Sequence, residues 1–326
     1  MYAADELHGL NWMFPAFATE DATDINSTDT IAVDNMRDAI NKGIDDGIDV
    51  ISIMGSYGEC HTLLFEEFQT IVTAAVEFVD NRVPLMIGVT SINSREVVRK
   101  ARFAREVGAQ AIFVGVPHYY PPTVDNAIEF YRGICELFPD LSVQIYHNPT
   151  LHHIHIPVRA FPELIKNQNI VSMKDSHRTP LEFMRLQDIV RGKISMFVNQ
   201  SQYYPYHDYG ARGFWSTDAA MGPWPLLALR NAVDAGDEEA AKQVLRDISP
   251  GGGGEGGDFT GPQDNARKLA AAHAGYCDPG PNRPPFVLVA PQSLERAIKR
   301  AEAWKTLCAK YRPIVEAARQ APAPVG

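Results

Sequence analysis

Short apolar runs alternate with longer amphipathic segments along most of this chain. The apolar runs are rich in β-branched or aromatic residues and are flanked by turn residues, which is typical of strands. Eight strands are predicted, over Leu10–Phe17, Val50–Met54, Pro84–Val89, Ala111–Val116, Ser142–Tyr146, Ile170–Met173, Ile194–Val198 and Gly213–Trp215. Other segments repeat apolar residues at spacings of three and four and predict helices, over Leu63–Val79, Ser94–Val107, Thr123–Phe138, Thr179–Val190 and Trp224–Ala235.

The order of these segments predicts the fold class. Continuous apolar strands that alternate with helices imply a parallel sheet covered by helices. About eight such units in roughly the first 235 residues indicate an α/β fold of the (β/α)8 TIM-barrel type rather than an open doubly wound sheet. No G-x-G-x-x-G follows the first strand, which weakens a dinucleotide-binding interpretation.

Residues 236–326 predict a helical C-terminal extension that packs on the barrel of residues 1–235, so that both form one structural unit. Helical patterns occur at Asp237–Ile248, Asn265–Ala274 and Gln292–Tyr311. The run Gly251–Gly257 has no preceding strand and no following Gly-Lys-Ser/Thr, so we expect a flexible connection rather than a phosphate-binding loop. The tail Gln320–Gly326 is rich in alanine and proline and is expected to fray.

Composition narrows the function classes. The 326 residues are 45% hydrophobic and 21% charged, which is a globular composition. A net charge of −10 argues against nucleic acid or anionic membranes as partners, but leaves room for a small anionic substrate. No apolar run has the length of a membrane span, and the N-terminus has no basic segment of a secretory signal. Four widely spaced cysteines without a C-x-x-C fit free thiols in a reducing cytoplasm.

Polar residues gather directly after the predicted strands, where a barrel carries its active site. Lys174 follows a buried strand, and desolvation there would lower its pKa and make it a nucleophile that can form a Schiff base with a ketone. A buried lysine paired with Asp175 explains the pattern equally well. Tyr146 ends the preceding strand, from which a phenol could move protons near Lys174. A core tyrosine is the simpler interpretation of Tyr146 alone.

Two further patterns admit more than one interpretation. The turn Gly55–Glu59 offers hydroxyls and exposed N–H groups that suit a carboxylate, although an ordinary turn between strand and helix has the same composition. Four histidines could suggest a metal site, but their spacing does not place a pair at i and i+4 and prolines interrupt the segment. Surface positions or a contribution to anion binding suit them better: His147, His152, His153 and His155.

Four motifs, in order, resemble those of the dihydrodipicolinate synthase and N-acetylneuraminate lyase superfamily of class I pyruvate aldolases. They are the G-x-x-G-E turn at 55–59, Pro117-His118-Tyr119 for a P-Y-Y segment, a Y-x-N-P segment at 146–149, and the strand-six lysine Lys174. The resemblance spans about Leu10 to Pro285. Dihydrodipicolinate synthase usually has two threonines where Ser56 and Tyr57 stand, which argues against a role in lysine biosynthesis.

Within this superfamily the chain is most similar to the hydratase-aldolases of aromatic-hydrocarbon degradation, including the phenanthrene and naphthalene pathways. The segments that carry this similarity are Gly-Ser-Tyr-Gly-Glu-Cys at 55–60, Phe-Val-Gly-Val-Pro at 113–117, Phe-Trp-Ser at 214–216 and Pro-Gly-Pro-Asn-Arg-Pro-Pro at 279–285. The naphthalene-pathway branch tends to have Asp where His147 stands. The similarity therefore favours the carboxybenzalpyruvate branch.

The resemblance implies a lyase that uses no metal and no organic cofactor, because the iminium formed on the lysine is the electron sink. It implies trans-2'-carboxybenzalpyruvate as substrate, with 2-carboxybenzaldehyde and pyruvate as products. The runner-up is trans-o-hydroxybenzylidenepyruvate, which gives salicylaldehyde and pyruvate. A sugar-acid pyruvate aldolase, a metal-dependent aldolase and a non-catalytic binding protein on the same barrel are the remaining alternatives. The second carboxylate of the favoured substrate would need cations or donors, for which the candidates are His147, His177 and Arg178.

The resemblance also implies residue roles and a homotetramer. Lys174 would form the Schiff base and Tyr146 would relay protons. The other predicted residues bind substrate: Ser56 and Tyr57 at its carboxylate, Asn148 at water or the β-hydroxyl, Trp215 at the aromatic ring, Tyr119 near a neighbouring subunit's site, and Ser216 without a more specific role.

Overall fold

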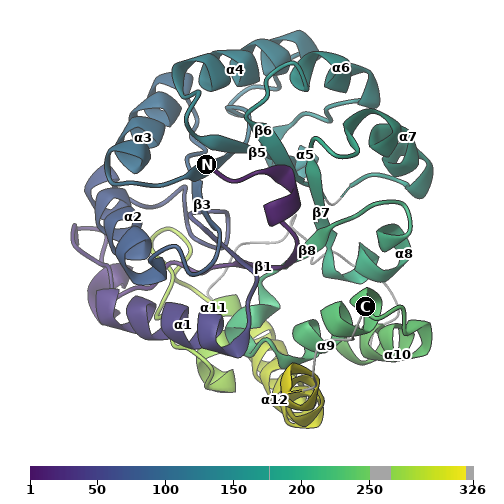
Figure 1. The fold of residues 1–326 in the computed structure, drawn as a ribbon. Coiled ribbons are helices and arrows are strands. Elements are labelled where there is room, and N and C mark those ends of the chain that lie inside the picture. Colours follow the sequence, from purple (N-terminus) through teal and green to yellow (C-terminus); the bar gives the residue numbers. More distant parts are fainter. Residues whose placement is uncertain (176, 250–265, 321–326) are drawn as a thin grey trace.

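Eight parallel strands close into a barrel in chain order, and the last strand pairs with the first (Figure 1). The computed structural model describes residues 1–175, 177–249 and 266–320. The strands are β1 (Gly9–Met13), β2 (Val50–Ile53), β3 (Leu85–Gly88), β4 (Ala111–Val114), β5 (Ser142–Tyr146), β6 (Ile170–Lys174), β7 (Ser195–Asn199) and β8 (Gly213–Ser216). The predicted (β/α)8 fold is confirmed, and all eight predicted strands are present.

The bounds of two strands differ from the prediction in an informative way. β1 ends at Met13 rather than Phe17, because Pro15 has no N–H with which to continue the ladder. β6 includes Lys174 as its last residue rather than ending before it. The direction of the Lys174 side chain is therefore fixed by the pleat of the strand.

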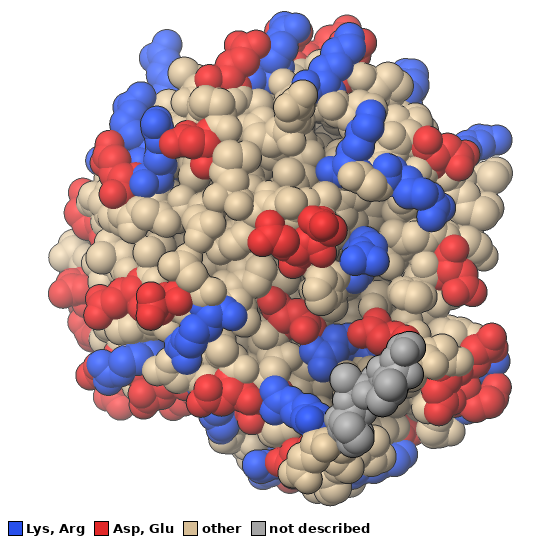
Figure 2. Space-filling view, in the orientation of Figure 1, with Lys and Arg blue, Asp and Glu red and all other residues tan. Residues whose placement is uncertain are grey.

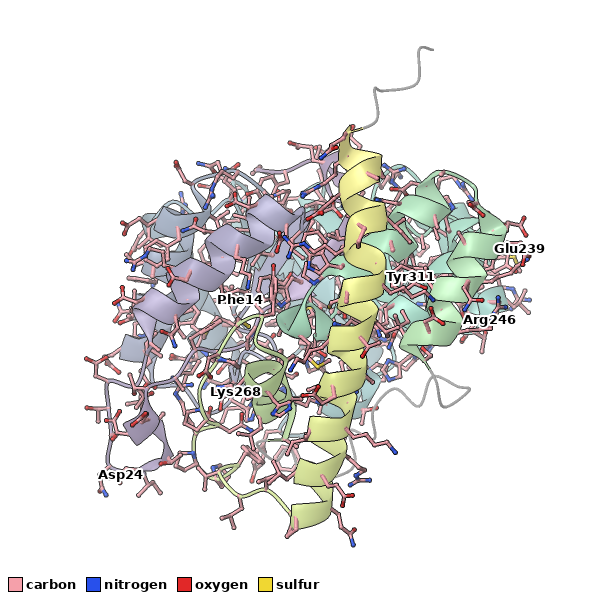
Figure 3. The ribbon with its side chains drawn as sticks, turned by 90° about the horizontal axis from the view of Figure 1, so that it is seen from below. Phe14, Asp24, Glu239, Arg246, Lys268 and Tyr311 are labelled. Carbon is pink, nitrogen blue, oxygen red and sulfur yellow. The ribbon has the colours of Figure 1, made fainter. Side chains whose placement is uncertain are left out.

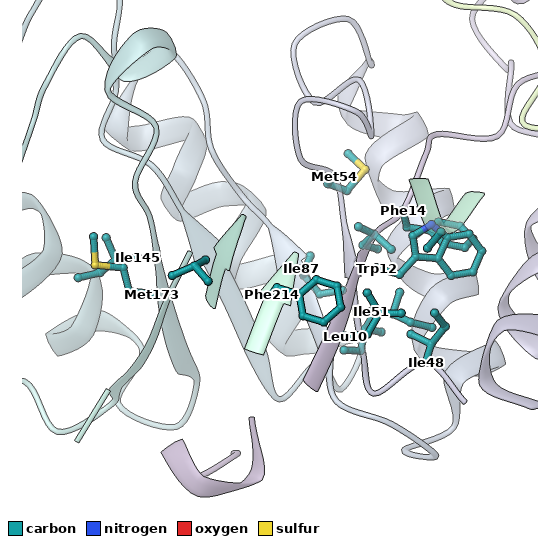
Figure 4. Close-up of a cluster of buried hydrophobic side chains, with 14 of the residues drawn as sticks. Leu10, Trp12, Phe14, Ile48, Ile51, Met54, Ile87, Ile145, Met173 and Phe214 are labelled. Carbon is teal, nitrogen blue, oxygen red and sulfur yellow. The ribbon is translucent and has the colours of Figure 1, made fainter. Parts of the chain in front are cut away.

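Both faces of the strands are buried, which explains why they are continuously apolar in the sequence. One set of side chains faces outward and packs beneath the helices, as Figure 4 shows for Leu10, Ile51 and Phe214. The alternate set fills the barrel interior and includes Phe113 and Phe197. Alternation along each strand thus separates an outer core from an inner one.

Helices surround the barrel (Figure 1). They are α1 (Val33–Asp46), α2 (Phe65–Val79), α3 (Ser94–Glu106), α4 (Val124–Leu137), α5 (Pro149–His152), α6 (Phe161–Leu164), α7 (Pro180–Val190), α8 (Tyr203–His207) and α9 (Trp224–Asp234). Thr123 and Thr179 cap α4 and α7, and each accepts a hydrogen bond from the third N–H of its helix. No helix is predicted over α1, although its buried residues Met36, Ala39, Ile40 and Gly43 follow helical spacing.

Short 3-10 helices complete the connections: η1 (Ala4–Glu6), η2 (Glu20–Thr23), η3 (Val158–Ala160), η4 (Gln200–Gln202) and η5 (Asp218–Met221). The segment that contains η1 crosses the centre of the view in Figure 1. It is held there by hydrogen bonds from the Tyr2 N–H to Ser142 and from the Ser195 hydroxyl to the Leu7 carbonyl. This segment therefore covers the end of the barrel where the strands begin.

Three helices of the C-terminal region lie against the barrel, namely α10 (Glu238–Ile248), α11 (Ala266–Ala274) and α12 (Pro291–Gln320). α10 packs on α9, and α12 packs on both α9 and α11. Figure 3 shows α12 running along the outside of the molecule. The helix continues past Pro313 rather than ending at Tyr311 as predicted, and Val315 in its last turns is buried. Packing of this kind offsets the hydrogen bond lost at a proline.

The division of the chain at residue 235 stays a prediction. The glycine run 251–257 and the tail after Gln320 lie outside the described residues. Acidic and basic side chains are interspersed on the face shown in Figure 2. Among the described helices, none is both long and apolar enough to cross a membrane.

Candidate active site

Lys174 and Tyr146 lie side by side at the C-terminal ends of neighbouring strands. β5 and β6 pair these two residues directly in register. The Lys174 Nζ lies 4.6 Å from the centre of the Tyr146 ring and 3.7 Å from the centre of the Trp215 ring. Trp215 on β8 belongs to the same inner core as Tyr146. The strand register therefore brings three of the predicted site residues together.

The Lys174 side chain is only 3% exposed, and its environment favours the neutral amine. Burial lowers the pKa of Lys174 to about 7, against a smaller opposing effect of the Asp175 charge. Successive residues of a strand point to opposite faces, and Asp175 pairs on its own side with His147 and Arg178. In the described part of the chain no carboxylate forms a salt bridge with Lys174. The geometry is that of a desolvated amine, not of a buried ion pair.

Tyr146 is held by a hydroxyl contact to the turn after β2. Its hydroxyl lies 2.8 Å from the Ser56 Oγ. Burial raises the pKa of Tyr146, against smaller lowering effects of hydrogen bonds from Ser56 and Asn148. The phenol is therefore protonated near neutral pH and can donate a proton toward the space beside Lys174. Its ring packs edge-on against Phe113 and His152, which fixes its orientation.

The turn Gly55–Glu59 has a backbone that its sequence explains. A Cβ at Gly58 would lie 2.7 Å from the Met54 nitrogen, so only glycine fits there. Two hydrogen bonds close the turn, from the Glu59 N–H to the Ser56 carbonyl and from the Cys60 N–H to the Gly55 carbonyl. The Ser56 N–H donates to the Tyr146 hydroxyl, whereas among the described residues the Tyr57 N–H has no protein acceptor. The turn thus presents the Ser56 hydroxyl and N–H next to Tyr146.

Asn148 and Tyr57, which were also predicted to bind substrate, have different surroundings. Asn148 is buried, and its side chain caps α5 by accepting from the Leu151 N–H. Tyr57 is half-buried. The charged groups near its hydroxyl include Arg267 and Arg300 of the C-terminal region. Asn148 therefore contacts Tyr146, whereas the Tyr57 ring packs on the outer core, and its assignment to the substrate carboxylate stays a prediction.

Two predicted residues are not brought to Lys174. Ser216 pairs in register with Trp12, which packs in the outer core. The Ser216 hydroxyl donates to Gln200 (2.5 Å) and accepts from the Asp218 N–H. Tyr119 is 72% exposed in the β4–α4 connection. Neither side chain touches the Lys174 cluster within this chain, and their assignment to substrate binding stays a prediction.

A buried ion network lies directly behind Lys174. The Ile156 N–H donates to the His147 Nε2, so the His147 proton is assigned to Nδ1, which donates to Asp175 (3.0 Å). The Arg178 Nε lies 2.6 Å from the other Asp175 oxygen, as an ion pair without hydrogen-bond alignment. Burial alone would raise the pKa of Asp175, but His147 and Arg178 outweigh it and hold that pKa well below its usual range. His147 and Arg178 thus both contact Asp175, whereas the third candidate, His177, is exposed.

The histidine-rich segment does not assemble a metal-binding group. Among the residues that the structure describes, no three His, Cys, Asp or Glu side chains converge as metal ligands. Two of its histidines, His147 and His152, are buried, so the predicted surface position is wrong for both, and burial lowers the pKa of His152 to about 3. His152 is therefore neutral at physiological pH, and its ring packs on that of Tyr146 at 4.8 Å. Its place here is beside the proposed proton relay.

Sequence reasoning missed two kinds of residue at this site. The rings of Phe113 and His152 pack on that of Tyr146, a contact that the sequence analysis assigned to neither residue. Lys268 and Arg283 reach Glu59 of the turn from the C-terminal region. Arg283 lies in one of the motifs that carry the resemblance, but nothing in the sequence indicated its partner.

Comparisons with known proteins place these features in a family context. Residues 16–250 match the model of the dihydrodipicolinate synthetase family. The chain is 30% identical over 320 residues to a trans-O-hydroxybenzylidenepyruvate hydratase-aldolase of Pseudomonas putida, with 94% of this chain and 96% of that protein covered. It is 24% identical over 324 residues to a trans-2'-carboxybenzalpyruvate hydratase-aldolase of Nocardioides sp., with 94% and 95% covered. A solved structure described as PhdJ bound to a substrate intermediate superposes with a TM-score of 0.88 at 24% identity, covering 95% of this chain and 99% of that one.

Proposed function

The chain belongs to the dihydrodipicolinate synthetase family and is a lyase, and from this premise we propose that it is a Schiff-base hydratase-aldolase. It would add water to a substituted trans-benzylidenepyruvate and cleave the product to an aromatic aldehyde and pyruvate. The observation that carries this proposal is the buried Lys174 amine, which has no carboxylate partner in the described chain and lies against Tyr146 and Trp215. Such an amine is poised for attack on a ketone.

The first step forms the imine. The neutral Nζ of Lys174 attacks the keto carbon, and the carbonyl oxygen takes up a proton through the Tyr146 hydroxyl. Loss of one water then gives an iminium that is conjugated with the double bond. The substrate carboxylate would meanwhile bind the Ser56 hydroxyl and the Tyr57 N–H of the turn, which suit an anion. This places the keto carbon between the carboxylate turn and Lys174.

The next steps add water to the substrate and cleave one of its carbon–carbon bonds. Water adds its hydroxyl to the benzylic carbon, and a proton goes to the adjacent carbon. Removal of the new hydroxyl proton breaks the bond between these two carbons, and the electron pair passes into the iminium. The aldehyde leaves, and a pyruvate enamine remains on Lys174. Protonation and hydrolysis by a second water release pyruvate and restore the amine. Tyr146 is the proposed proton relay in these steps, and Asn148 is proposed to orient the added water.

The ring substituent is the finer question. The sequence favours a carboxylated ring, but that substrate needs partners for its second carboxylate. Two of the three candidates, His147 and Arg178, are buried against Asp175. Because they already contact this carboxylate, the structure supports a substrate with an uncharged ring substituent. The higher identity to the hydroxybenzylidenepyruvate relatives points the same way. We therefore propose trans-o-hydroxybenzylidenepyruvate as the preferred substrate, with the carboxylated compound as the second candidate.

The test is a comparison of kcat/KM for the two benzylidenepyruvates, with aldehyde and pyruvate measured in equal amounts. A preference of about tenfold or more for the hydroxylated substrate supports the assignment, since it corresponds to about 1.4 kcal/mol of transition-state binding. Equal values, or a preference for the carboxylated substrate, would contradict it. Lys174→Ala should release no aldehyde, and a chelator should leave the wild-type rate unchanged. If the wild type turns over neither substrate, the assignment as a hydratase-aldolase is refuted.

A homotetramer is the proposed assembly. Tyr119 and Tyr120 project from the β4–α4 connection with their rings 5.0 Å apart, and both are largely exposed. Exposed aromatic pairs of this kind are typical of surfaces that become buried in an interface. Sedimentation of the purified protein would determine the number of subunits.

A further inference from the structure

A buried cluster of opposite charges joins the C-terminal region to the turn after β2. The Lys268 Nζ lies 2.5 Å from a Glu59 oxygen, and the Arg283 Nη1 lies 2.8 Å from the same oxygen. The Arg283 backbone N–H donates to the other Glu59 oxygen at 2.8 Å. All three side chains are less than one-tenth exposed. Figure 3 shows Lys268 on α11, alongside α12.

The two cations are themselves fixed by further contacts. Lys268 also donates to the Pro281 carbonyl (3.0 Å). Arg283 donates to the Thr30 hydroxyl and carbonyl, each at 2.7 Å. Thr30 in turn donates to Glu67 at the start of α2. The cluster therefore ties the turn to three distant parts of the chain, and a buried carboxylate with this many donors has one well-defined position.

The turn needs such a constraint because its backbone is strained. Met54, directly before the turn, and Glu59, its last residue, have positive φ values of 63° and 50°. Non-glycine residues keep a positive φ only where the surrounding structure imposes that backbone conformation. Glu59 is three residues from Ser56 and its N–H closes the turn on the Ser56 carbonyl. A shift of Glu59 would thus move the Ser56 hydroxyl away from Tyr146.

We propose that Lys268 and Arg283 are positioning residues for the substrate carboxylate. They hold Glu59, and through it the Ser56–Tyr57 turn, in the geometry that binds the anion beside Tyr146 and Lys174. This inference rests on the proposed function, in which that turn receives the carboxylate. The C-terminal region is then part of the binding site although neither cation contacts the substrate. Removing either cation should weaken binding of the carboxylate before and during reaction alike, and so raise KM more than it lowers kcat.

The experiment compares Lys268→Met, Lys268→Arg and Glu59→Gln with the wild type. Three quantities are measured, namely KM and kcat for the benzylidenepyruvate, and the pyruvate concentration that gives half-maximal borohydride trapping on Lys174. For Lys268→Met we expect KM and the pyruvate concentration for half-maximal trapping each to rise about tenfold, while kcat changes less than about threefold. Lys268→Arg, which keeps a cation near Glu59, should recover most of the loss. Glu59→Gln keeps the side-chain shape and should behave like Lys268→Met.

The matched control is Arg230→Gln, which removes a partly buried ion pair with Asp49, the residue before β2, at the opposite end of that strand from the turn. It should lower Tm and leave both concentrations unchanged. The inference is overturned if folded Lys268→Met keeps the wild-type values, or if Arg230→Gln raises them equally. If Lys268→Met does not fold, Glu59→Gln decides by the same criterion. A wild type that traps no pyruvate would refute the proposed function and this inference with it, whereas normal trapping in every variant refutes the inference alone.

Discussion

Replacing Lys174 with methionine should make the protein more stable while abolishing turnover. Lys174 is 3% exposed and has no carboxylate partner in the described chain, so its charged form is disfavoured in the folded state. Burial lowers its pKa from 10.5 to about 7. Each tenfold change in proton affinity corresponds to about 1.4 kcal/mol, so full protonation costs the folded state up to about 5 kcal/mol. Methionine fills similar space without this cost.

The pH dependence gives the sign of the effect. Below about pH 7 the lysine is protonated in both the folded and the unfolded state, and the cost is fully present. Between pH 7 and 10.5 the unfolded state binds more protons than the folded state, so the wild type gains stability as pH rises. The advantage of Lys174→Met should therefore be largest at pH 6 and fade toward pH 10.5.

The assay is equilibrium unfolding in urea at pH 6, 8 and 10, at equal protein concentration, followed by circular dichroism. Lys166→Met is the control, because Lys166 is 67% exposed and its one ion pair among the described residues is with Glu163. It should change the unfolding free energy by less than about 0.5 kcal/mol at every pH. A Lys174→Met variant that is less stable than the wild type at pH 6 would refute the reasoning, because that is the behaviour of a lysine held in a buried ion pair.

Three further predictions follow from the same geometry. Tyr146→Phe removes the hydroxyl that contacts Ser56 and should slow imine formation about 100-fold, measured as the rate of pyruvate trapping, and a rate within threefold of the wild type would exclude the relay. The wild-type trapping rate should rise about tenfold per pH unit up to about pH 7 and then level off as the Lys174 amine loses its proton, whereas a rise that continues to pH 10 would contradict the lowered pKa. Asp175→Asn leaves the Arg178 charge without its partner and should lower the unfolding free energy by about 3 kcal/mol in urea titrations, and an unchanged value would show that the pair is not needed for stability.

Periodicity predicted the barrel because strands that are buried on both faces and helices that cover them leave distinct sequence patterns. The eight strands follow from that rule, and so does the position of Lys174 at a strand end. Local rules failed where tertiary packing decides. α12 continues through Pro313 because the helix packs on α9 and α11, and no rule based on single residues predicts that outcome.

Within the site, the sequence could rank residues but not pair them. Lys174 and Tyr146 were predictable as neighbours because consecutive parallel strands align their ends. The partners of Asp175 were not, since Lys174, His147 and Arg178 are all close in sequence or in fold, and only the pleat decides which of them it meets. The contacts of Glu59 with Lys268 and Arg283 span more than 200 residues. Pairings of that separation leave no signal in local pattern or spacing.

The decisive experiment measures the intact mass of the protein after incubation with pyruvate and borohydride, and then maps the modified peptide. We expect one reduced pyruvate adduct per chain, located on the peptide that contains Lys174 and absent in Lys174→Met. No adduct, or an adduct on another lysine such as the buried Lys268, would contradict it.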